Sequence, residues 1–220
     1  MAGVIEPRYQ SDQVTLYCAD CLDVLPQLEQ VDAVITDPVW PNAPNNIFGR
    51  AINPVDLLGE SLSMIRAKRL VIVLRYDSDP RFLIAVPIHW KFFRVQTMEY
   101  RIPGYNGRKL GGQEYAYSFG DPIPSADGQR VIPGNGPKVQ KTEDNGHPAP
   151  RSIDHFRWLI HWWSMPGETV LDPFMGSGTT GIACLMMTDR HFIGIEIDPT
   201  YYAIAEKRIR QAELQIRMPI

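Results

Sequence analysis

The sequence predicts an α/β domain with a mainly parallel sheet, helices on both faces and a late antiparallel strand pair. Short apolar runs that suit buried strands alternate along the chain with longer amphipathic runs that suit helices. A glycine-rich turn joins one such strand directly to a helix. The 220 residues, 44% hydrophobic and 21% charged, suit one folded core. We therefore expect residues 1–220 to form a single domain.

The strands are expected where apolar, β-branched residues cluster between turn residues. The five strands expected in the parallel part are Val14–Asp20, Val31–Asp37, Arg69–Tyr76, Thr169–Phe174 and His191–Asp198. Phe92–Ile102 and Gln113–Phe119 indicate the late antiparallel pair. Four helices are expected between or after these strands. They cover Pro54 to about Lys68 with Asn53 as the cap, Ser152–Trp163, Thr179–Thr188 and Thr200–Leu214.

Residues 103–150 break this alternation. They hold 7 Pro and 9 Gly among 48 residues, which is about a third of the segment. Apart from Gln113–Phe119, this composition predicts loop. Long loops are usually functional or disordered, so we expect either an excursion that contacts the substrate or a mobile lid.

Charge is segregated along a chain whose net charge is -3. Residues 1–65 carry -7, whereas residues 66–109 carry +7. A basic stretch on an acidic protein is typical of a surface that meets phosphates, although basic residues scattered over a solvated surface give the same count. Arg101, Arg108 and Lys109 are the best nucleic-acid-binding candidates because they border the Gly/Pro-rich segment.

Cysteine content and hydropathy favour a cytoplasmic protein. Three cysteines cannot form a disulfide framework, and no apolar run is long enough to span a membrane. The first ten residues lack the pattern of a signal peptide. Cys18 and Cys21 have the spacing of half a metal site, but no second pair completes it. We expect neither a metal site nor a membrane partner.

A strand-to-helix turn at Leu171–Thr180 is the strongest local motif. Gly176 and Gly178 let the backbone approach a ligand closely, and the next helix presents free N–H groups to an anion. No lysine follows, so the turn is not a P-loop. Gly181 completes a G-x-G-x-x-G pattern, and Glu196 ends the next strand at the distance of a ribose-binding acid. A nicotinamide-dependent oxidoreductase is therefore a competing hypothesis.

A second motif, Thr36–Trp40, follows a strand in the other half of the chain. Asp37 and the Pro38 carbonyl can accept two hydrogens from an amino group, while the Trp40 indole can stack on a flat ring. An ordinary turn at a strand end is the alternative for this motif alone. Only 24 residues follow Glu196, too few for the further strand–helix units that a dinucleotide fold needs.

Together the two motifs resemble the DNA amino-methyltransferases (N6-adenine and N4-cytosine), specifically the circularly permuted group whose catalytic D-P-P-[YFW] motif precedes D-P-F-x-G-S-G-T-T. Further segments follow the family's order: Leu16–Asp20, Gly146–Pro150 before a helix, Gly167–Thr180 and Phe192–Asp198. The resemblance covers residues 14–40 and 146–210. It implies a Rossmann-like S-adenosylmethionine-dependent methyltransferase fold with permuted motif order.

The resemblance also implies the site. Asp37, Pro38 and Trp40 would be catalytic, with the target base flipped between them. The residues implied to bind S-adenosylmethionine are Asp20, Asp172, Phe174, Gly176, Ser177, Gly178, Thr179, Thr180 and Glu196. Within that set, Glu196 would take the ribose hydroxyls. The partner would be DNA, as in restriction-modification enzymes, and Asp37 as first letter favours adenine N6 over cytosine N4.

One residue departs from the family pattern. Val39 stands where the family has a second proline, so the turn that carries Trp40 is less stiff. A catalytically silent, nucleic-acid-binding member and an RNA N6-adenine methyltransferase remain open alternatives, and so does a homodimer.

Overall fold

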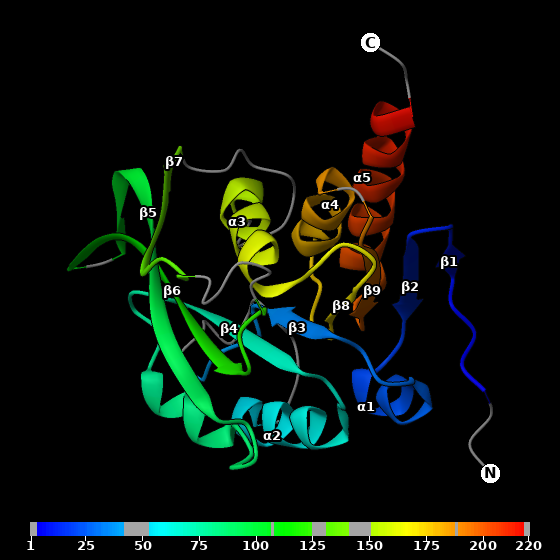
Figure 1. Ribbon diagram of the computed structural model, residues 1–220, viewed down its shortest axis with the longest axis horizontal. Helices are drawn as coiled ribbons and strands as arrows, with labels where there is room; N and C mark the ends of the chain where they lie inside the picture. Colours follow the sequence, from blue (N-terminus) through cyan, green and yellow to red (C-terminus); the bar gives the residue numbers. More distant parts are fainter. Residues whose placement is uncertain are drawn as a thin grey trace.

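The computed structural model describes residues 4–41, 53–106, 108–124, 131–140, 151–187 and 189–217. Within these ranges one nine-stranded sheet runs in the order β1-β2-β9-β8-β3-β4-β6-β5-β7 (Figure 1). The five strands from β2 to β4 in this order are parallel, and β6 then pairs antiparallel with β4 and β5. The predicted fold class, a mainly parallel sheet with a late antiparallel pair, is confirmed.

The strands and helices lie close to the predicted segments. The strands are β1 (Tyr9–Gln10), β2 (Val14–Cys18), β3 (Ala33–Thr36), β4 (Arg69–Arg75), β5 (Phe92–Asn106), β6 (Lys109–Gly120), β7 (Asn135–Val139), β8 (Thr169–Asp172) and β9 (His191–Glu196). The α-helices are α1 (Cys21–Val24), α2 (Pro54–Met64), α3 (Ile153–Trp163), α4 (Thr179–Met186) and α5 (Pro199–Arg217), and the short 3-10 helices are η1 (Leu25–Gln27) and η2 (Pro80–Ala85). Asn53 caps α2 as predicted, its side chain accepting from the Val55 N–H at 3.0 Å.

Helices cover both faces of the sheet. α3, α4 and α5 lie on one face, and α1 and α2 lie on the other (Figure 1). The interior of β4 is apolar from Leu70 to Leu74 because both of its faces are covered: Val71 and Val73 pack on the α3 side, whereas Leu70 and Ile72 pack on the α2 side. Alternate residues of a strand face opposite ways, so a strand with helices on both sides needs an unbroken apolar run.

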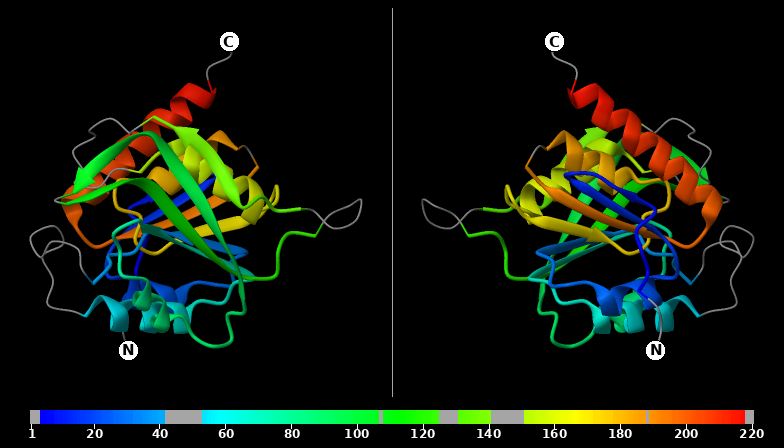
Figure 2. Two further views of the ribbon diagram at one scale, coloured as in Figure 1. Left: turned by 90° about the vertical axis from the view of Figure 1, so that its left-hand side faces the viewer. Right: turned by 90° about the vertical axis from the view of Figure 1, so that its right-hand side faces the viewer.

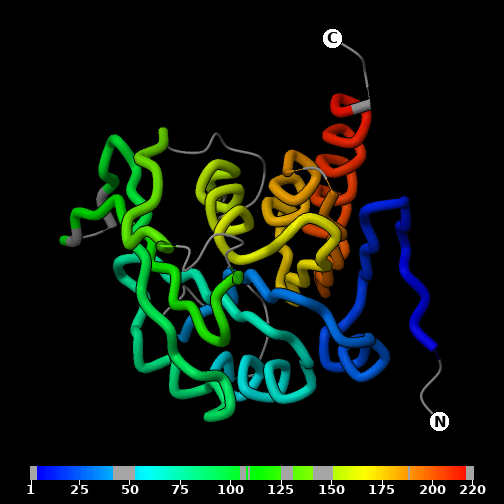
Figure 3. The backbone as a smooth tube through the Cα atoms, viewed as in Figure 1, coloured from blue at the N-terminus to red at the C-terminus, as the bar shows by residue number. Residues whose placement is uncertain are grey.

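The two ends of the chain contribute to the same edge of the molecule. Figure 3 shows the N-terminal strands beside the C-terminal helix α5. The Tyr9 hydroxyl donates to Glu213, and the Ser11 hydroxyl donates to the same carboxylate at 2.5 Å. β1 and β2 are therefore tied to α5 at this edge.

The parallel strands reverse their winding between β3 and β8. β8 leads through α4 on one face to β9, while the chain after β3 leads through α2 on the other face to β4. Adjacent strands whose following helices lie on opposite faces leave a crevice beyond their carboxyl ends. This crevice receives both sequence motifs.

Two expectations about secondary structure were wrong. The first long helix ends at Met64 rather than near Lys68, because Ile65 is already extended. Residues 103–150 are not all loop outside Gln113–Phe119. β5 continues to Asn106, β6 begins at Lys109, and β7 pairs with β5; residues 125–130 and 141–150 lie outside the described part.

β5 and β6 form a long antiparallel hairpin in spite of its glycines. Main-chain hydrogen bonds hold the two strands together, and Gly104 is paired opposite Gly111. Figure 2 shows this long hairpin at the end of the sheet.

Among the described helices, none has the length and apolar character needed to cross a membrane.

Candidate active site

A pocket of about 630 Å³ lies at the carboxyl ends of β2, β3, β8 and β9. That volume is in the range of small-molecule sites. Residues from several chain segments that are distant in sequence line it. They include Asp20, Asp37, Pro38, Trp40, Arg151, Asp172, Phe174, Gly176, Ser177, Thr179, Thr180 and Glu196. Of the residues predicted to bind the cofactor or act in catalysis, Gly178 alone does not line the pocket.

Asp172 ties the glycine-rich turn to the neighbouring strand. Its carboxylate accepts from the Thr36 hydroxyl at 2.7 Å, the Phe174 N–H at 3.2 Å and the Thr180 hydroxyl at 2.5 Å. Burial raises the pKa of Asp172 to about 6, although these hydrogen bonds oppose the rise. The end of β3, the end of β8 and the first turn of α4 are thus joined at one carboxylate.

Gly178 gives the turn its shape. It has φ +79°, in the left-handed region, and forms the N-cap of α4. A Cβ at this position would lie 3.1 Å from the side chains of Ala205 and Ile209 on α5. Glycine is therefore required both by the backbone conformation and by the packing of α5 behind the turn.

Glu196 supports the same turn from the end of β9. One carboxylate oxygen accepts from the Gly176 N–H at 3.0 Å, and the other accepts from the Asp198 N–H at 2.8 Å. Burial raises the pKa of Glu196 to about 7, against the effect of these two N–H groups. Asp20 stands at the end of β2, where it caps α1 by accepting from the Leu22 N–H at 3.1 Å. Both carboxylates border the pocket.

The loop after β3 supplies the other wall. Asp37 is held by Arg151 through two hydrogen bonds, Nε to Oδ2 at 2.5 Å and Nη2 to Oδ1 at 2.9 Å. The Trp40 ring is 6% exposed and lies near two guanidinium groups, those of Arg151 at 5.6 Å and Arg75 at 5.7 Å from the ring centroid. Burial raises the pKa of Asp37, while Arg151 acts to lower it.

Arg151 and Glu114 are site residues that sequence reasoning did not single out. Arg151 directly follows the Gly146–Pro150 segment, which itself lies outside the described residues. Glu114 could have been noticed, because it shares a strand face with buried Ala116 and Ser118. A carboxylate on a buried strand face needs a partner, and here that partner is Arg151.

The predicted nucleic-acid contacts lie away from the pocket, on the β5–β6 hairpin. Arg108 is exposed at the turn of this hairpin, and Arg101 is exposed with its Nε 3.3 Å from the Lys138 carbonyl oxygen. The side chain of Lys109 lies outside what the structure describes. Part of the basic window is neutralised by ion pairs, namely Lys68–Asp32, Arg69–Glu168, Arg75–Asp77 and Arg81–Asp79.

The cysteine pair forms no metal site within the described residues. Cys18 and Cys21 are not joined in a disulfide, and the Cys21 Sγ lies 3.4 Å from the Ser61 hydroxyl. The described residues contain no group of three or more His, Cys, Asp or Glu side chains suited to a metal ion.

Comparison with known proteins gives one family. A model of the N6/N4 type, described as DNA methylase, matches residues 33–207. Among curated proteins, the chain is 45% identical over 51 residues to type II methyltransferase M.Cfr9I of Citrobacter freundii, covering 23% of this chain and 17% of that protein. It is 34% identical over 106 residues to DNA adenine methyltransferase YhdJ of Escherichia coli, covering 46% and 36%. The chain thus spans well under half the length of these relatives.

Solved structures resemble a larger part of the chain. M1.HpyAVI in complex with SAM superposes with a TM-score of 0.67 at 24% identity, covering 89% of this chain and 99% of the other. The cytosine-N4-specific PvuII DNA methyltransferase gives 0.66 at 17% identity, covering 96% and 95%. At these identities the similarity establishes the fold.

Proposed function

The chain belongs to the N6/N4 DNA methylase family, and from its pocket we propose that it methylates an exocyclic amino group of a DNA base with S-adenosylmethionine as donor. One observation carries the proposal. The glycine-rich turn and the Asp37 loop, separated by more than a hundred residues in sequence, line a single pocket. A site for group transfer requires the donor and the acceptor to share one cavity.

The donor is proposed to lie over the glycine-rich turn. Ser177 and Thr179, at the start of α4, would hold its carboxylate with the help of the free N–H groups of the helix. Asp172 would face its ammonium, and a cation there would favour the ionised form of a carboxyl whose pKa is about 6. Glu196 would accept from the ribose hydroxyls, and Asp20 would lie by the adenine ring.

The acceptor base is proposed to enter beside Asp37. Bound S-adenosylmethionine supplies an electrophilic methyl group on a sulfonium centre. The amino group of a base is a weak nucleophile because its lone pair is delocalised into the ring. The Asp37 carboxylate and the Pro38 carbonyl would accept hydrogen bonds from the two N–H groups of this amine and so favour a tetrahedral nitrogen. Trp40 would stack on the base. The contribution of these residues is positioning and electrostatics, with no covalent intermediate.

Adenine N6 is our first choice of acceptor and cytosine N4 the second, since Asp37 begins the motif. The chain resembles proteins of both kinds by name, the adenine methyltransferase YhdJ and the cytosine-N4-specific PvuII enzyme. We also propose that it belongs to the permuted group, acts at specific sites as restriction-modification enzymes do, and uses DNA rather than RNA.

Labelling identifies the acceptor directly. The protein is incubated with tritiated S-adenosylmethionine and either DNA or RNA, and the nucleic acid is digested to nucleosides. We expect label in N6-methyladenine from DNA. Label in N4-methylcytosine would transfer the proposal to cytosine, and label only in RNA would refute DNA as the substrate. An unlabelled product from a protein that binds the donor would indicate the catalytically silent alternative.

Binding of the donor is tested separately by thermal melting. S-adenosylmethionine or its demethylated product should raise the melting temperature, because a ligand that binds only the folded state stabilises it. NAD should leave the melting temperature unchanged. A shift with NAD alone would favour the oxidoreductase reading of the glycine-rich turn and refute the methyltransferase proposal.

The role of Asp37 is tested by Asp37→Ala. We expect methyl transfer to be lost and donor binding to remain nearly intact, since Asp37 borders the acceptor side of the pocket. Asp79→Ala, which removes a carboxylate from the exposed ion pair with Arg81, is the matched control. A variant that keeps more than a tenth of the wild-type rate has lost less than about 1.4 kcal/mol of transition-state stabilisation. In that case Asp37 does not accept the hydrogen bond from the amino group that is methylated.

A further inference from the structure

A buried group of polar side chains lies behind Asp37. Arg151 bridges two carboxylates, with Nε and Nη2 donating to Asp37 and Nη1 donating to Glu114 at 2.9 Å. Glu114 also accepts from the Tyr100 hydroxyl at 2.9 Å and lies 2.8 Å from His155 Nδ1. These side chains come from β5, β6, α3 and the loops before α3 and after β3.

This group is held in place by its burial. The Glu114 side chain is 1% exposed and the Arg151 side chain 9%. Burial acts to raise the pKa of Glu114, but the charge of Arg151 and the contact with His155 outweigh it, so the pKa is lowered and Glu114 is an anion. An anion anchored in β6 fixes one end of the guanidinium, and a planar guanidinium then presents its other edge in a fixed orientation.

We propose that Arg151 is a positioning residue that fixes the Asp37 carboxylate and the Trp40 ring for the incoming base. The inference rests on the proposed role of Asp37 as acceptor of the amine hydrogens. Two hydrogen bonds from one guanidinium set the plane of the carboxylate as well as its position. An ionised carboxylate has about four lone-pair sites, and Arg151 uses two of them. Acceptor capacity therefore remains for the amino group.

Arg151 also counters the effect of burial on Asp37. A protonated Asp37 would turn one acceptor oxygen into a donor and oppose the amine. The charged groups that act on Asp37 are Arg151 and the more distant Arg75, which favour the anion, and Glu114 and Asp172, which disfavour it. Among these four groups, Arg151 is the one that donates hydrogen bonds to Asp37 in the described part of the chain, so its removal should raise the pKa of Asp37 further.

The same contacts would restrain the turn that carries Val39. Val39 lacks the ring that would stiffen the turn between Asp37 and Trp40. Arg151 contacts both flanking side chains, by hydrogen bonds to Asp37 and by the 5.6 Å approach to the Trp40 ring. Restraint that a proline would supply through the backbone is thus supplied here through two side chains.

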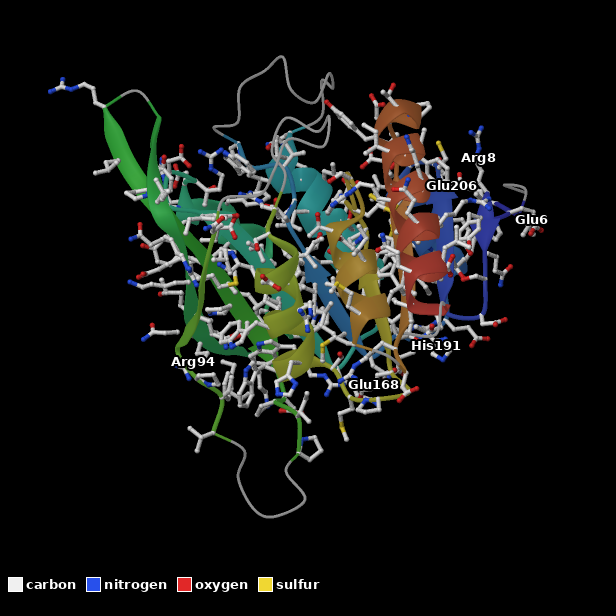
Figure 4. The ribbon with its side chains drawn as sticks, turned by 90° about the horizontal axis from the view of Figure 1, so that it is seen from above. Glu6, Arg8, Arg94, Glu168, His191 and Glu206 are labelled. Atoms are coloured by element: carbon white, nitrogen blue, oxygen red, sulfur yellow. The ribbon has the colours of Figure 1, made fainter. Side chains whose placement is uncertain are left out.

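The experiment compares Arg151→Met and Arg151→Lys with a control that loses a similar buried ion pair elsewhere. Arg69→Met is that control. Arg69 is buried and bonds Glu168 at 2.6 Å, and Glu168 lies by His191 at the amino-terminal edge of the sheet, away from the pocket (Figure 4). Three quantities are measured for each variant: the single-turnover rate of methyl transfer against pH, donor affinity by calorimetry, and the titration of the Asp37 carboxyl carbon by NMR, assigned with Asp37→Asn.

We expect Arg151→Met to lower the rate at pH 7 by about a hundredfold, to leave donor affinity within about threefold, and to move the titration of Asp37 and the acid limb of the rate profile upward by at least one pH unit. Arg151→Lys keeps the charge but cannot donate in a planar pair. It should leave the Asp37 titration near its wild-type position and still lose about tenfold in rate. Arg69→Met should lower the melting temperature and leave the profile unmoved.

Several results would overturn the inference. They are an Asp37 titration that is the same in Arg151→Met and wild type, a wild-type rate in Arg151→Lys, or a shifted profile in Arg69→Met. If Arg151→Met does not fold, the rate of Arg151→Lys decides. The NMR titration needs no turnover, so a wild-type protein that binds the donor but transfers no methyl group would refute the proposed function, while a shifted Asp37 titration would still support the contact.

Discussion

Replacing Glu196 by glutamine should stabilise the protein above neutral pH and weaken its binding of S-adenosylmethionine. The carboxylate ends β9, accepts from the N–H groups of Gly176 and Asp198, and has its pKa raised by burial to about 7 from an ordinary value near 4.5. The folded protein therefore carries a charge that its surroundings disfavour. If that charge serves to bind the ribose hydroxyls, stability and affinity respond to its removal in opposite directions.

The magnitude follows from the two pKa values. Because the folded-state pKa lies above the unfolded one, the folded state binds the proton more tightly. The free energy of unfolding then falls as the pH rises from about 4.5 to about 7, and stays low above that. The interval corresponds to roughly 3 kcal/mol. Glutamine carries no charge, but its NH₂ would face one of the two N–H donors. This unpaired contact would reduce the gain in stability by about 1–2 kcal/mol. We expect a net gain of about 1–2 kcal/mol at pH 8.

Urea unfolding from pH 5 to pH 8.5 measures this directly. The wild-type free energy of unfolding should decline relative to that of Glu196→Gln across pH 5 to 7.5. Glu206→Gln, on the exposed pair with Arg210 in α5, should run parallel to wild type. Parallel curves for Glu196→Gln would refute the burial argument. Undiminished donor affinity in calorimetry at pH 8 would refute the role of Glu196 at the ribose.

Three further outcomes follow from the loop, the hairpin and the turn. Val39→Pro should keep or raise the methyl transfer rate, measured with tritiated donor, because it stiffens a turn already held by side chains; a loss of rate without unfolding would show that the loop needs another conformation. Replacing Arg108 and Lys109 together by alanine should flatten the dependence of log DNA affinity on log salt by about two, at about 0.9 for each phosphate contact, with donor affinity unaltered. An unchanged slope places the DNA elsewhere. Gly178→Ala should lower the free energy of unfolding by about 1–3 kcal/mol, from left-handed backbone strain and contact with Ala205, and a thermal melt within 1 °C of wild type would contradict it.

Much of the pocket could be predicted because its residues stand at strand ends. Asp20, Asp37, Asp172 and Glu196 each follow or close a short apolar segment, and the carboxyl ends of parallel strands meet at one edge of a sheet. Alternation of strands and helices then brings these positions together with no knowledge of the side-chain contacts. The local pattern indicated the strands and the two motifs, while the family resemblance supplied Asp20 and the role of Asp172.

The contacts between side chains could not be predicted in the same way. Arg151 and Asp37 are 114 positions apart, and no periodicity couples them. The hairpin between Phe92 and Gly120 was underestimated for a related reason: its pairing depends on main-chain hydrogen bonds, and composition at Gly104 and Gly111 points to loop. Local propensity is a weak guide where tertiary pairing decides.

The boundary between β3 and β8 divides the sheet into two parts. All strands inserted between these two in sequence, β4 to β7, lie on one side of the boundary, and β8, β9, β2 and β1 lie on the other. Besides the pairing of β3 with β8, the Thr36 hydroxyl bonds Asp172 across this boundary, and Arg69 of β4 bonds Glu168 just before β8. A lengthened hairpin or an added segment after β4 would therefore enlarge the far edge without shifting the strands that hold the donor turn. Under the proposed function, such an enlarged edge would offer DNA a different surface while the pocket kept its position.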